Sequence, residues 1–323
     1  MARFIKLLKD SHIDRPKPGV LNRIRSSFAA ELFANIDNAT SACDFYYKIE
    51  ALPSTTTRAI INSQLHINVN GPLSLENPKL LTATDDEGRH IVVKLLFVGT
   101  DSARSVTARR QDITNEIQCC QDLGLSTQLS HEIALVPCEV VTVFVPLEFA
   151  SRSRITGEHS ALLMPRFITS LVYNTACNVG VVVREGRRMV EALRYIHSRG
   201  YVHMDVKADN IFVNLSGAWF LGDFGSACKV NNKIQSSTEV FYYERIIGQP
   251  AETKYDWFML LVTLLRELGD RQQWMTTFVR DNHVDKVLIV EETKRVIDSC
   301  ESSLKGLPTL VTEIASLAEL ELS

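Results

Sequence analysis

The sequence predicts an α+β protein of two lobes, in which a small β-rich lobe with one helix precedes a larger, mainly helical lobe. The chain has 323 residues, which is long enough for two lobes that each bury a core. Apolar segments of strand length prevail over residues 46–165, whereas apolar residues at helical spacing prevail over residues 166–323. We therefore place the boundary between the lobes near residue 165.

The elements of the first lobe follow from apolar runs that turn residues interrupt. The acidic, glycine-containing stretch Asp85–Gly88 has the composition of a hairpin turn between two strands. In the predicted helix, Ile113, Ile117 and Cys120 recur at the three- and four-residue spacing of one helix face. The first lobe is predicted to contain strands at Leu65–Val69, Lys79–Thr84, His90–Phe97, Ile133–Val145 and Ala161–Phe167, and a helix at Arg109–Leu123.

The second lobe is predicted to begin with a long helix at Val181–Ser198, followed by short strands at Ile211–Val213 and Trp219–Leu221. Before the first lobe, residues 1–45 read as a basic, helical N-terminal extension with a break at Pro16–Gly19. The first 25 residues contain seven basic and two acidic side chains. An anionic partner is therefore expected to bind this extension rather than the lobes.

The composition excludes several classes of protein. Lys and Arg total 35 against 38 Asp and Glu, and this near balance gives no strong nucleic-acid signal. No apolar run reaches the ~18 residues that span a bilayer, so we expect no membrane span. The seven cysteines include no pair with metal-ligand spacing and are expected to be buried thiols in a reducing compartment. These features favour an intracellular protein of the cytoplasm or nucleus and leave its oligomeric state open.

The most informative segment runs from Tyr195 to Ile211, and Asp223–Phe224–Gly225 follows 18 residues after Asp205. Carboxylate and amide oxygens are hard ligands suited to Mg²⁺, and phosphoryl transfer depends mainly on positioning and on neutralisation of charge. In order and spacing, these residues resemble the catalytic loop and metal-binding motif of the eukaryotic protein kinases. The resemblance implies a bilobal protein-kinase-like fold.

The resemblance also implies a role for each polar residue of this segment. Asp205 is expected to orient the attacking hydroxyl, and Lys207 to neutralise charge on the transferred phosphate. A lysine at this position is the signature of the serine/threonine type. Asn210 and Asp223 are the implied metal ligands, and through the metal they contribute to nucleotide binding.

Residues of the first lobe complete the implied nucleotide site. Lys94 resembles the strand lysine that holds the α- and β-phosphates of ATP. Glu116, 22 residues later, is expected to anchor this lysine, with Asp112 as the weaker candidate. Pro165 to Phe167 are expected to connect the lobes and to present backbone groups to adenine, with Met164 behind them as gatekeeper.

Further matches lie in the second lobe. Asp256 is expected to hydrogen-bond to the backbone around His203 and Met204, and the rings of His203 and Phe224 to pack in an apolar column with Cys120. Glu244 matches the acidic end of the activation segment, and Arg295 is a candidate partner for it. Ser237 or Thr238 is expected to contact Lys207.

The chain departs from the family pattern in three places. Asn70–Pro78, at the position of the glycine-rich phosphate loop, contains two prolines and a single glycine, so it offers fewer flexible N–H donors to phosphates. Met204 replaces the usual arginine, which implies that activity does not require a phosphorylated activation segment. Only 67 residues follow Asp256, so the second lobe is shortened.

The sequence therefore predicts a serine/threonine-protein kinase, a transferase that moves the γ-phosphate of ATP to a protein hydroxyl with Mg²⁺. ATP and a protein substrate are the implied partners. Two alternatives remain open. The first is a pseudokinase or scaffold with weak or no nucleotide binding, which the missing glycine-rich loop favours. The second is a small-molecule phosphotransferase, although Lys207 and Asp256 favour the protein-kinase branch.

Overall fold

The structure is a computed structural model, and it describes residues 62, 65, 67–73, 80–96, 106–126, 130, 132–145, 157–174, 178–237, 241–269, 271–281, 283–299 and 306–322. The described chain forms two compact units that divide between Arg166 and Phe167. Two short segments that precede this point, Gln121–Gly124 and Leu129–Val136, belong to unit 2. The predicted extension at 1–45 and the centre of the predicted phosphate loop, at 74–79, lie outside the described residues.

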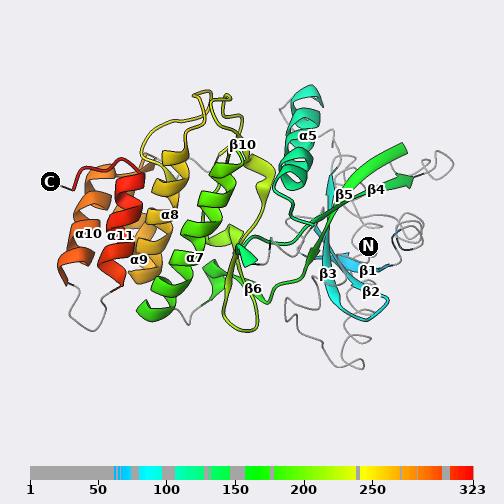
Figure 1. Cartoon of the computed structure of the whole chain (residues 1–323), viewed down its shortest axis with the longest axis horizontal. Helices are drawn as coiled ribbons and strands as arrows, with labels where there is room; N and C mark the ends of the chain where they lie inside the picture. Colours follow the sequence, from blue (N-terminus) through cyan, green and yellow to red (C-terminus); the bar gives the residue numbers. More distant parts are fainter. Residues whose placement is uncertain are drawn as a thin grey trace, which may run out of the picture. The chain divides into compact units, whose positions relative to one another are not determined.

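Unit 1 contains an antiparallel five-stranded sheet and one helix (Figure 1). The strands lie in the order β1-β2-β3-β5-β4. Their bounds, with that of the helix, are β1 Ile67–Pro72, β2 Leu80–Asp85, β3 His90–Leu96, α5 Val106–Asp122, β4 Glu139–Val145 and β5 Gly157–Pro165. The predicted strands before residue 100 and the predicted helix are thus confirmed, with ends displaced by at most three residues.

The β2–β3 hairpin forms because its sequence supplies both the turn and the core face. The Asp85 carboxylate accepts the backbone N–H groups of Glu87 and Arg89 at 3.0 and 2.8 Å, which closes the turn. Leu81 of β2 and Val93 of β3 have no exposed surface, and the residues two positions along each strand from them (Ala83, Ile91 and Leu95) are buried on the same face. The alternation places these side chains in the core cluster of unit 1.

The prediction of a strand over Ile133–Val145 is wrong in its first half, because β4 begins only at Glu139. The backbone of the preceding segment pairs elsewhere: Val136 N–H donates to the Leu221 carbonyl at 2.8 Å, within unit 2. Residues from Ala134 to Cys138 are all buried. A buried turn carries the same apolar run as a buried strand, so the pattern does not separate the two.

Unit 2 consists of helices with three small pairings of short strands (Figure 1). The strands pair as β6-β8-β9, β10-β7 and β11-β12. The elements are β6 Thr169–Ser170, η2 Leu171–Tyr173, α7 Val179–Ser198, β7 Tyr201–Val202, η3 Ala208–Asn210, β8 Ile211–Val213, β9 Trp219–Leu221, η4 Phe224–Ser226, β10 Cys228–Lys229, α8 Thr253–Leu268, α9 Arg271–Phe278, β11 Val279–Arg280, β12 His283–Val284, α10 Lys286–Ser299 and α11 Leu307–Leu317.

Helix α8 is the centre of unit 2. Almost every residue from Tyr255 to Leu265 is buried, because α7, α10 and α11 all pack against this helix. Gly186 of α7 permits a close approach, since an added Cβ would lie 2.8 Å from Leu310 and 3.3 Å from Leu264. The first turn of α8 carries the buried Asp256, which fixes the loop described below.

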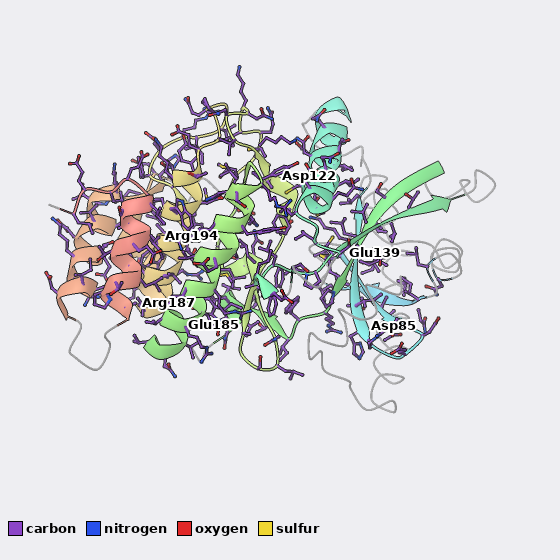
Figure 2. All side chains as sticks on the ribbon, viewed as in Figure 1. Asp85, Asp122, Glu139, Glu185, Arg187 and Arg194 are labelled. Atoms are coloured by element: carbon purple, nitrogen blue, oxygen red, sulfur yellow. The ribbon has the colours of Figure 1, made fainter. Side chains whose placement is uncertain are left out.

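A buried carboxylate links α7 to β9. Glu185, labelled in Figure 2, is only 2% exposed. It accepts the backbone N–H of Trp219 at 3.0 Å and the guanidinium groups of Arg184 and Arg188 at 2.6 and 2.7 Å. Burial alone would raise the pKa of Glu185, but these hydrogen bonds and the charge of Arg188 outweigh it, so the pKa lies below its ordinary value.

This arrangement predicts a pH dependence of stability. A carboxyl group whose pKa is lowered on folding stabilises the fold above its unfolded pKa of about 4.3, and this stabilisation is lost as pH falls through the lowered folded value. We therefore expect Glu185→Gln to reduce the decline of the unfolding free energy below about pH 4.3, as measured by urea denaturation. The exposed Glu191 of α7 is the matched control as Glu191→Gln. If the unfolding free energy of Glu185→Gln declined with falling pH as much as that of the wild-type chain, the assignment of a lowered pKa to Glu185 would be contradicted.

Three of the four described cysteines, Cys119, Cys120 and Cys138, are buried thiols as predicted, and Cys228 is half-buried. The other three, at positions 43, 177 and 300, lie outside the described residues. Within the described ranges, no helix is both long and apolar enough to cross a bilayer.

Candidate active site

The loop that joins β7 to η3 is held by a single buried carboxylate. Asp256, with no exposed surface, accepts the backbone N–H of His203 at 2.7 Å and that of Met204 at 2.8 Å. His197 of α7 lies with its Nε2 at 2.9 Å from the same carboxylate. The predicted contact between Asp256 and this backbone is confirmed.

These bonds hold Met204 in an unfavourable conformation. Its φ is 65°, in the left-handed region that side chains with a Cβ disfavour. The side chain is fully buried, so Met204 serves as a core residue. The backbone bonds to Asp256 offset part of the conformational cost.

Asp205 lies between two donors from its own loop. Asn210 Nδ2 donates to its Oδ2 at 2.8 Å and to its backbone carbonyl at 2.9 Å. Lys207 Nζ is 3.0 Å from Oδ1. The structure thus brings together three predicted residues, and it fixes the orientation of a carboxylate whose side chain is 12% exposed.

His203 connects this loop to the segment that carries Asp223. Its Nδ1 accepts the backbone N–H of Asp205 at 3.3 Å, so the ring proton is on Nε2, which faces the Gly222 carbonyl at 3.1 Å. Gly222 is required here, because an added Cβ would lie 2.6 Å from the Val136 side chain. The predicted packing of His203 on Phe224 is confirmed, with ring centroids 5.1 Å apart.

Asp223 and Asn210 present oxygen donors of the kind that Mg²⁺ prefers. Asp223 is exposed and has a left-handed backbone, with φ of 61° and ψ of 78°, and its carboxylate accepts the Gly225 N–H at 3.4 Å. The amide nitrogen of Asn210 donates to Asp205, which leaves its amide oxygen as an acceptor. One carboxylate and one amide oxygen fit a hard divalent cation.

In unit 1, Lys94 and Glu116 form the expected ion pair, with Nζ 2.5 Å from Oε1. Lys94 lies on β3 and its side chain is 20% exposed, whereas the Glu116 side chain on α5 is 7% exposed. The glutamate therefore fixes the ammonium group of a lysine that would otherwise be costly in a buried strand.

The three residues predicted to contact adenine lie at and after the end of β5. Met164 is opposite Val92 of β3, and Pro165 is opposite Ile91. Phe167 belongs to unit 2, where its ring packs against Phe212 and Phe220 at centroid distances of 5.7 and 5.2 Å. The structure therefore shows a packing role for Phe167, and its place beside adenine stays a prediction.

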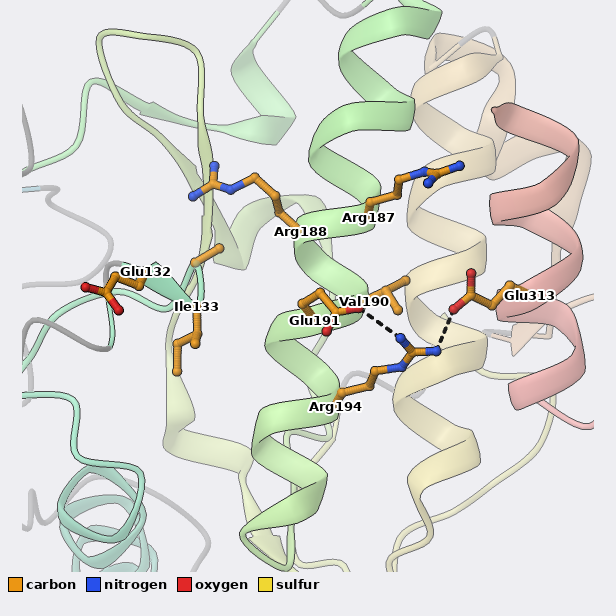
Figure 3. A pocket seen from close by; sticks show the side chains of 9 residues that line it. Glu132, Ile133, Arg187, Arg188, Val190, Glu191, Arg194 and Glu313 are labelled. Carbon is orange, nitrogen blue, oxygen red and sulfur yellow. Dashed lines mark hydrogen bonds and ion pairs between the residues drawn. The ribbon is translucent and has the colours of Figure 1, made fainter. Parts of the chain in front are cut away.

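A separate groove of about 400 Å³ runs beside α7 (Figure 3). Ile133, Ala134 and Val190 provide apolar lining, and Arg194 bridges Glu191 and Glu313 at 2.8 and 2.7 Å. None of the predicted site residues lines this groove. It is therefore distinct from the cluster around Asp205.

One contact adds to those inferred from the sequence, and one inferred contact is wrong. The Ser237 hydroxyl donates to the Met204 carbonyl at 2.8 Å, and Thr238 lies outside the described residues. The suggested pairing of Arg295 with Glu244 is wrong, because the Arg295 guanidinium binds Glu292 of the same helix. A hydrogen bond to a backbone carbonyl, as at Met204, leaves no signal in residue identity or spacing.

The comparison with protein families agrees with this geometry. The family model described as the protein kinase domain matches residues 82–315, more than two thirds of the chain. The chain belongs to the protein kinase domain family.

Several similar curated proteins are viral kinases. The serine/threonine-protein kinase US3 homolog of Gallid herpesvirus 2 (strain GA) is 49% identical over 164 residues, which cover 48% of this chain and 40% of that protein. Serine/threonine-protein kinase US3 of Human herpesvirus 1 (strain 17) is 44% identical over 118 residues, which cover 35% of this chain and 24% of that protein. The matches cover less than half of the length of these curated relatives.

A solved structure supports the fold. The kinase PK-1 of Cydia pomonella granulovirus superimposes with a TM-score of 0.52 at 16% sequence identity. The superposition covers 82% of this chain and 94% of that one. This likeness confirms the predicted protein-kinase-like fold, with a sheet-rich first part and a helical second part.

Proposed function

We propose that the chain is an active serine/threonine-protein kinase that transfers the γ-phosphate of ATP to a hydroxyl group of a protein. One observation carries the proposal: the Asp205 carboxylate is fixed by Asn210 and Lys207, as a residue that orients a hydroxyl must be. Membership of the family and the named activity of the US3 relatives support it.

In the proposed reaction, Asp205 accepts the hydrogen bond and then the proton of the substrate hydroxyl, whose oxygen forms a bond to the γ-phosphorus. The bond from that phosphorus to the β–γ bridging oxygen breaks, and ADP leaves. The Lys207 ammonium group, which lies beside Asp205, turns toward the transferred phosphate and neutralises part of its charge. Lys94, oriented by Glu116, binds the α- and β-phosphates.

Asn210 and Asp223 would hold Mg²⁺, which supplies positive charge to the phosphate oxygens. We further propose Met164, Pro165 and Phe167 as the residues beside adenine, on the basis of their order in the sequence. Dependence on ATP and the reduced cysteines favour action in the cytoplasm or nucleus.

The direct test uses the purified chain with Mg²⁺ and γ-labelled ATP on peptide libraries that contain Ser, Thr or Tyr as the only acceptor. We expect label on Ser and Thr peptides, and loss of labelling when EDTA removes the metal. ATP binding without transfer to any peptide would instead indicate the pseudokinase alternative. Transfer to small alcohols but to no peptide would indicate a small-molecule phosphotransferase.

Lys94 provides a second test. We expect Lys94→Met to lower kcat/KM for ATP by about 10²-fold or more, because a fixed positive charge on the phosphates is lost. This variant also removes the ion pair of the buried Glu116 with Lys94, which lowers stability. The double variant Lys94→Met/Glu116→Leu removes both charges and is expected to regain stability, measured by thermal unfolding, but not activity. Recovery of activity in the double variant would contradict the role of Lys94.

A further inference from the structure

The peptide group between Met204 and Asp205 is bound at both of its polar ends. Its carbonyl, from Met204, accepts the Ser237 hydroxyl at 2.8 Å. Its N–H, from Asp205, donates to His203 Nδ1 at 3.3 Å. Because a peptide group is planar, these two bonds fix the orientation of the whole plane. They thereby also constrain the direction in which the Asp205 side chain projects from the backbone.

The neighbouring peptide groups are fixed by other residues. The N–H of Met204 donates to Asp256, and the carbonyl of Asp205 accepts from Asn210. These anchors come from α8 and from the loop itself. Ser237 is the anchor contributed by the segment that follows Asp223–Phe224–Gly225, and it therefore couples the position of that segment to the orientation of Asp205.

Met204 needs such an anchor. Its φ of 65° is unfavourable for a residue with a Cβ, and Asp256 holds the preceding peptide group, which sets this φ. Rotation about ψ of Met204 would instead turn the following peptide plane, that of Met204 and Asp205. The Ser237 hydroxyl opposes this rotation by holding the carbonyl. Because the Ser237 hydroxyl proton forms this bond, the bond exists only while the serine is unmodified. This agrees with the presence of Met204 in place of the usual arginine, which implies that activity does not require a phosphorylated activation segment.

We propose that Ser237 is a positioning residue: its unmodified hydroxyl holds the Met204–Asp205 peptide plane and so keeps the Asp205 carboxylate aligned for catalysis. The inference rests on the proposed function where it concerns catalysis. The anchor itself is a property of the fold and is tested separately.

The kinetic test compares Ser237→Ala, which loses the hydroxyl, with Ser237→Thr, which keeps it. We expect Ser237→Ala to lower kcat roughly 3- to 10-fold with little change in KM for ATP, and Ser237→Thr to restore most of kcat. Ser198→Ala is the matched control, because the Ser198 hydroxyl also donates to a backbone carbonyl, that of Tyr195, at the exposed end of α7. An unchanged kcat in Ser237→Ala, or equal losses in the Ala and Thr variants, would overturn the proposal.

Hydrogen exchange tests the anchor without reference to activity. In Ser237→Ala we expect the Asp205 amide to exchange several-fold faster than in the wild-type chain and in Ser198→Ala, because its peptide plane is free to rotate. Unchanged exchange of this amide would overturn the anchor. If the wild-type chain transfers no phosphate but this exchange difference is found, the anchor stands and the proposed function fails.

Discussion

Asp205→Asn is expected to lower kcat for phosphate transfer by about 10²- to 10⁴-fold, the range typical for loss of a general base. An amide cannot accept the proton of the substrate hydroxyl. It also brings an NH₂ group toward one of the two donors that now bind the carboxylate, Asn210 Nδ2 or Lys207 Nζ. The measurement is kcat on a Ser or Thr peptide under saturating ATP.

The matched control for this variant is Asp209→Asn, which makes the same chemical change at an exposed residue of η3, the short helix that follows the loop of Asp205. We expect Asp209→Asn to keep wild-type kcat within about twofold and both variants to keep the wild-type thermal unfolding midpoint within a few degrees. Asp205→Asn with wild-type kcat would contradict the assignment of Asp205.

The residues around Asp205 could be inferred from the sequence because they are close along the chain. The segment from His203 to Asn210 is only eight residues long, so the identity and spacing of its residues determine which of its side chains meet. The contact of Asp256 with His203, 53 residues away along the chain, was also inferred, because the segment around Asp256 resembles a helix of the protein kinases.

Other features depend on backbone groups, which every residue shares. The contact of Ser237 with the Met204 carbonyl has no signature in side-chain identity, and the sequence pointed to Lys207 instead. The segment from Ile133 to Cys138 carries an apolar run that predicts a strand, because residues 134–138 are all buried whatever their backbone conformation. In both cases, pairing of the backbone with a distant part of unit 2 decides the outcome.

Asp256→Asn is expected to have the largest effect on stability. Asp256 has no exposed surface and binds three donors at 2.7, 2.8 and 2.9 Å, on His203, Met204 and His197. The amide has one oxygen instead of two, so at least one N–H loses its acceptor and faces an NH₂ group. We expect the free energy of unfolding to fall by about 2–4 kcal/mol.

The same substitution is expected to reduce catalysis, because Asp256 holds Met204 in its left-handed conformation and Asp205 follows directly. Urea denaturation measures the stability change, and kcat at low temperature, where the variant is folded, measures the second effect. Glu252→Gln, at the exposed start of α8, is the control and is expected to change the unfolding free energy by less than about 1 kcal/mol.

The two readouts separate the roles of Asp256. If Asp256 served only to stabilise α8, stability would fall while kcat of the folded variant stayed at the wild-type value. Because the three donors to Asp256 lie on the loop and on α7, we expect both the stability and kcat of the variant to fall. The loss of kcat is expected to persist when an osmolyte restores stability. A stability loss below about 1 kcal/mol would show that the buried carboxylate is not the anchor of this loop.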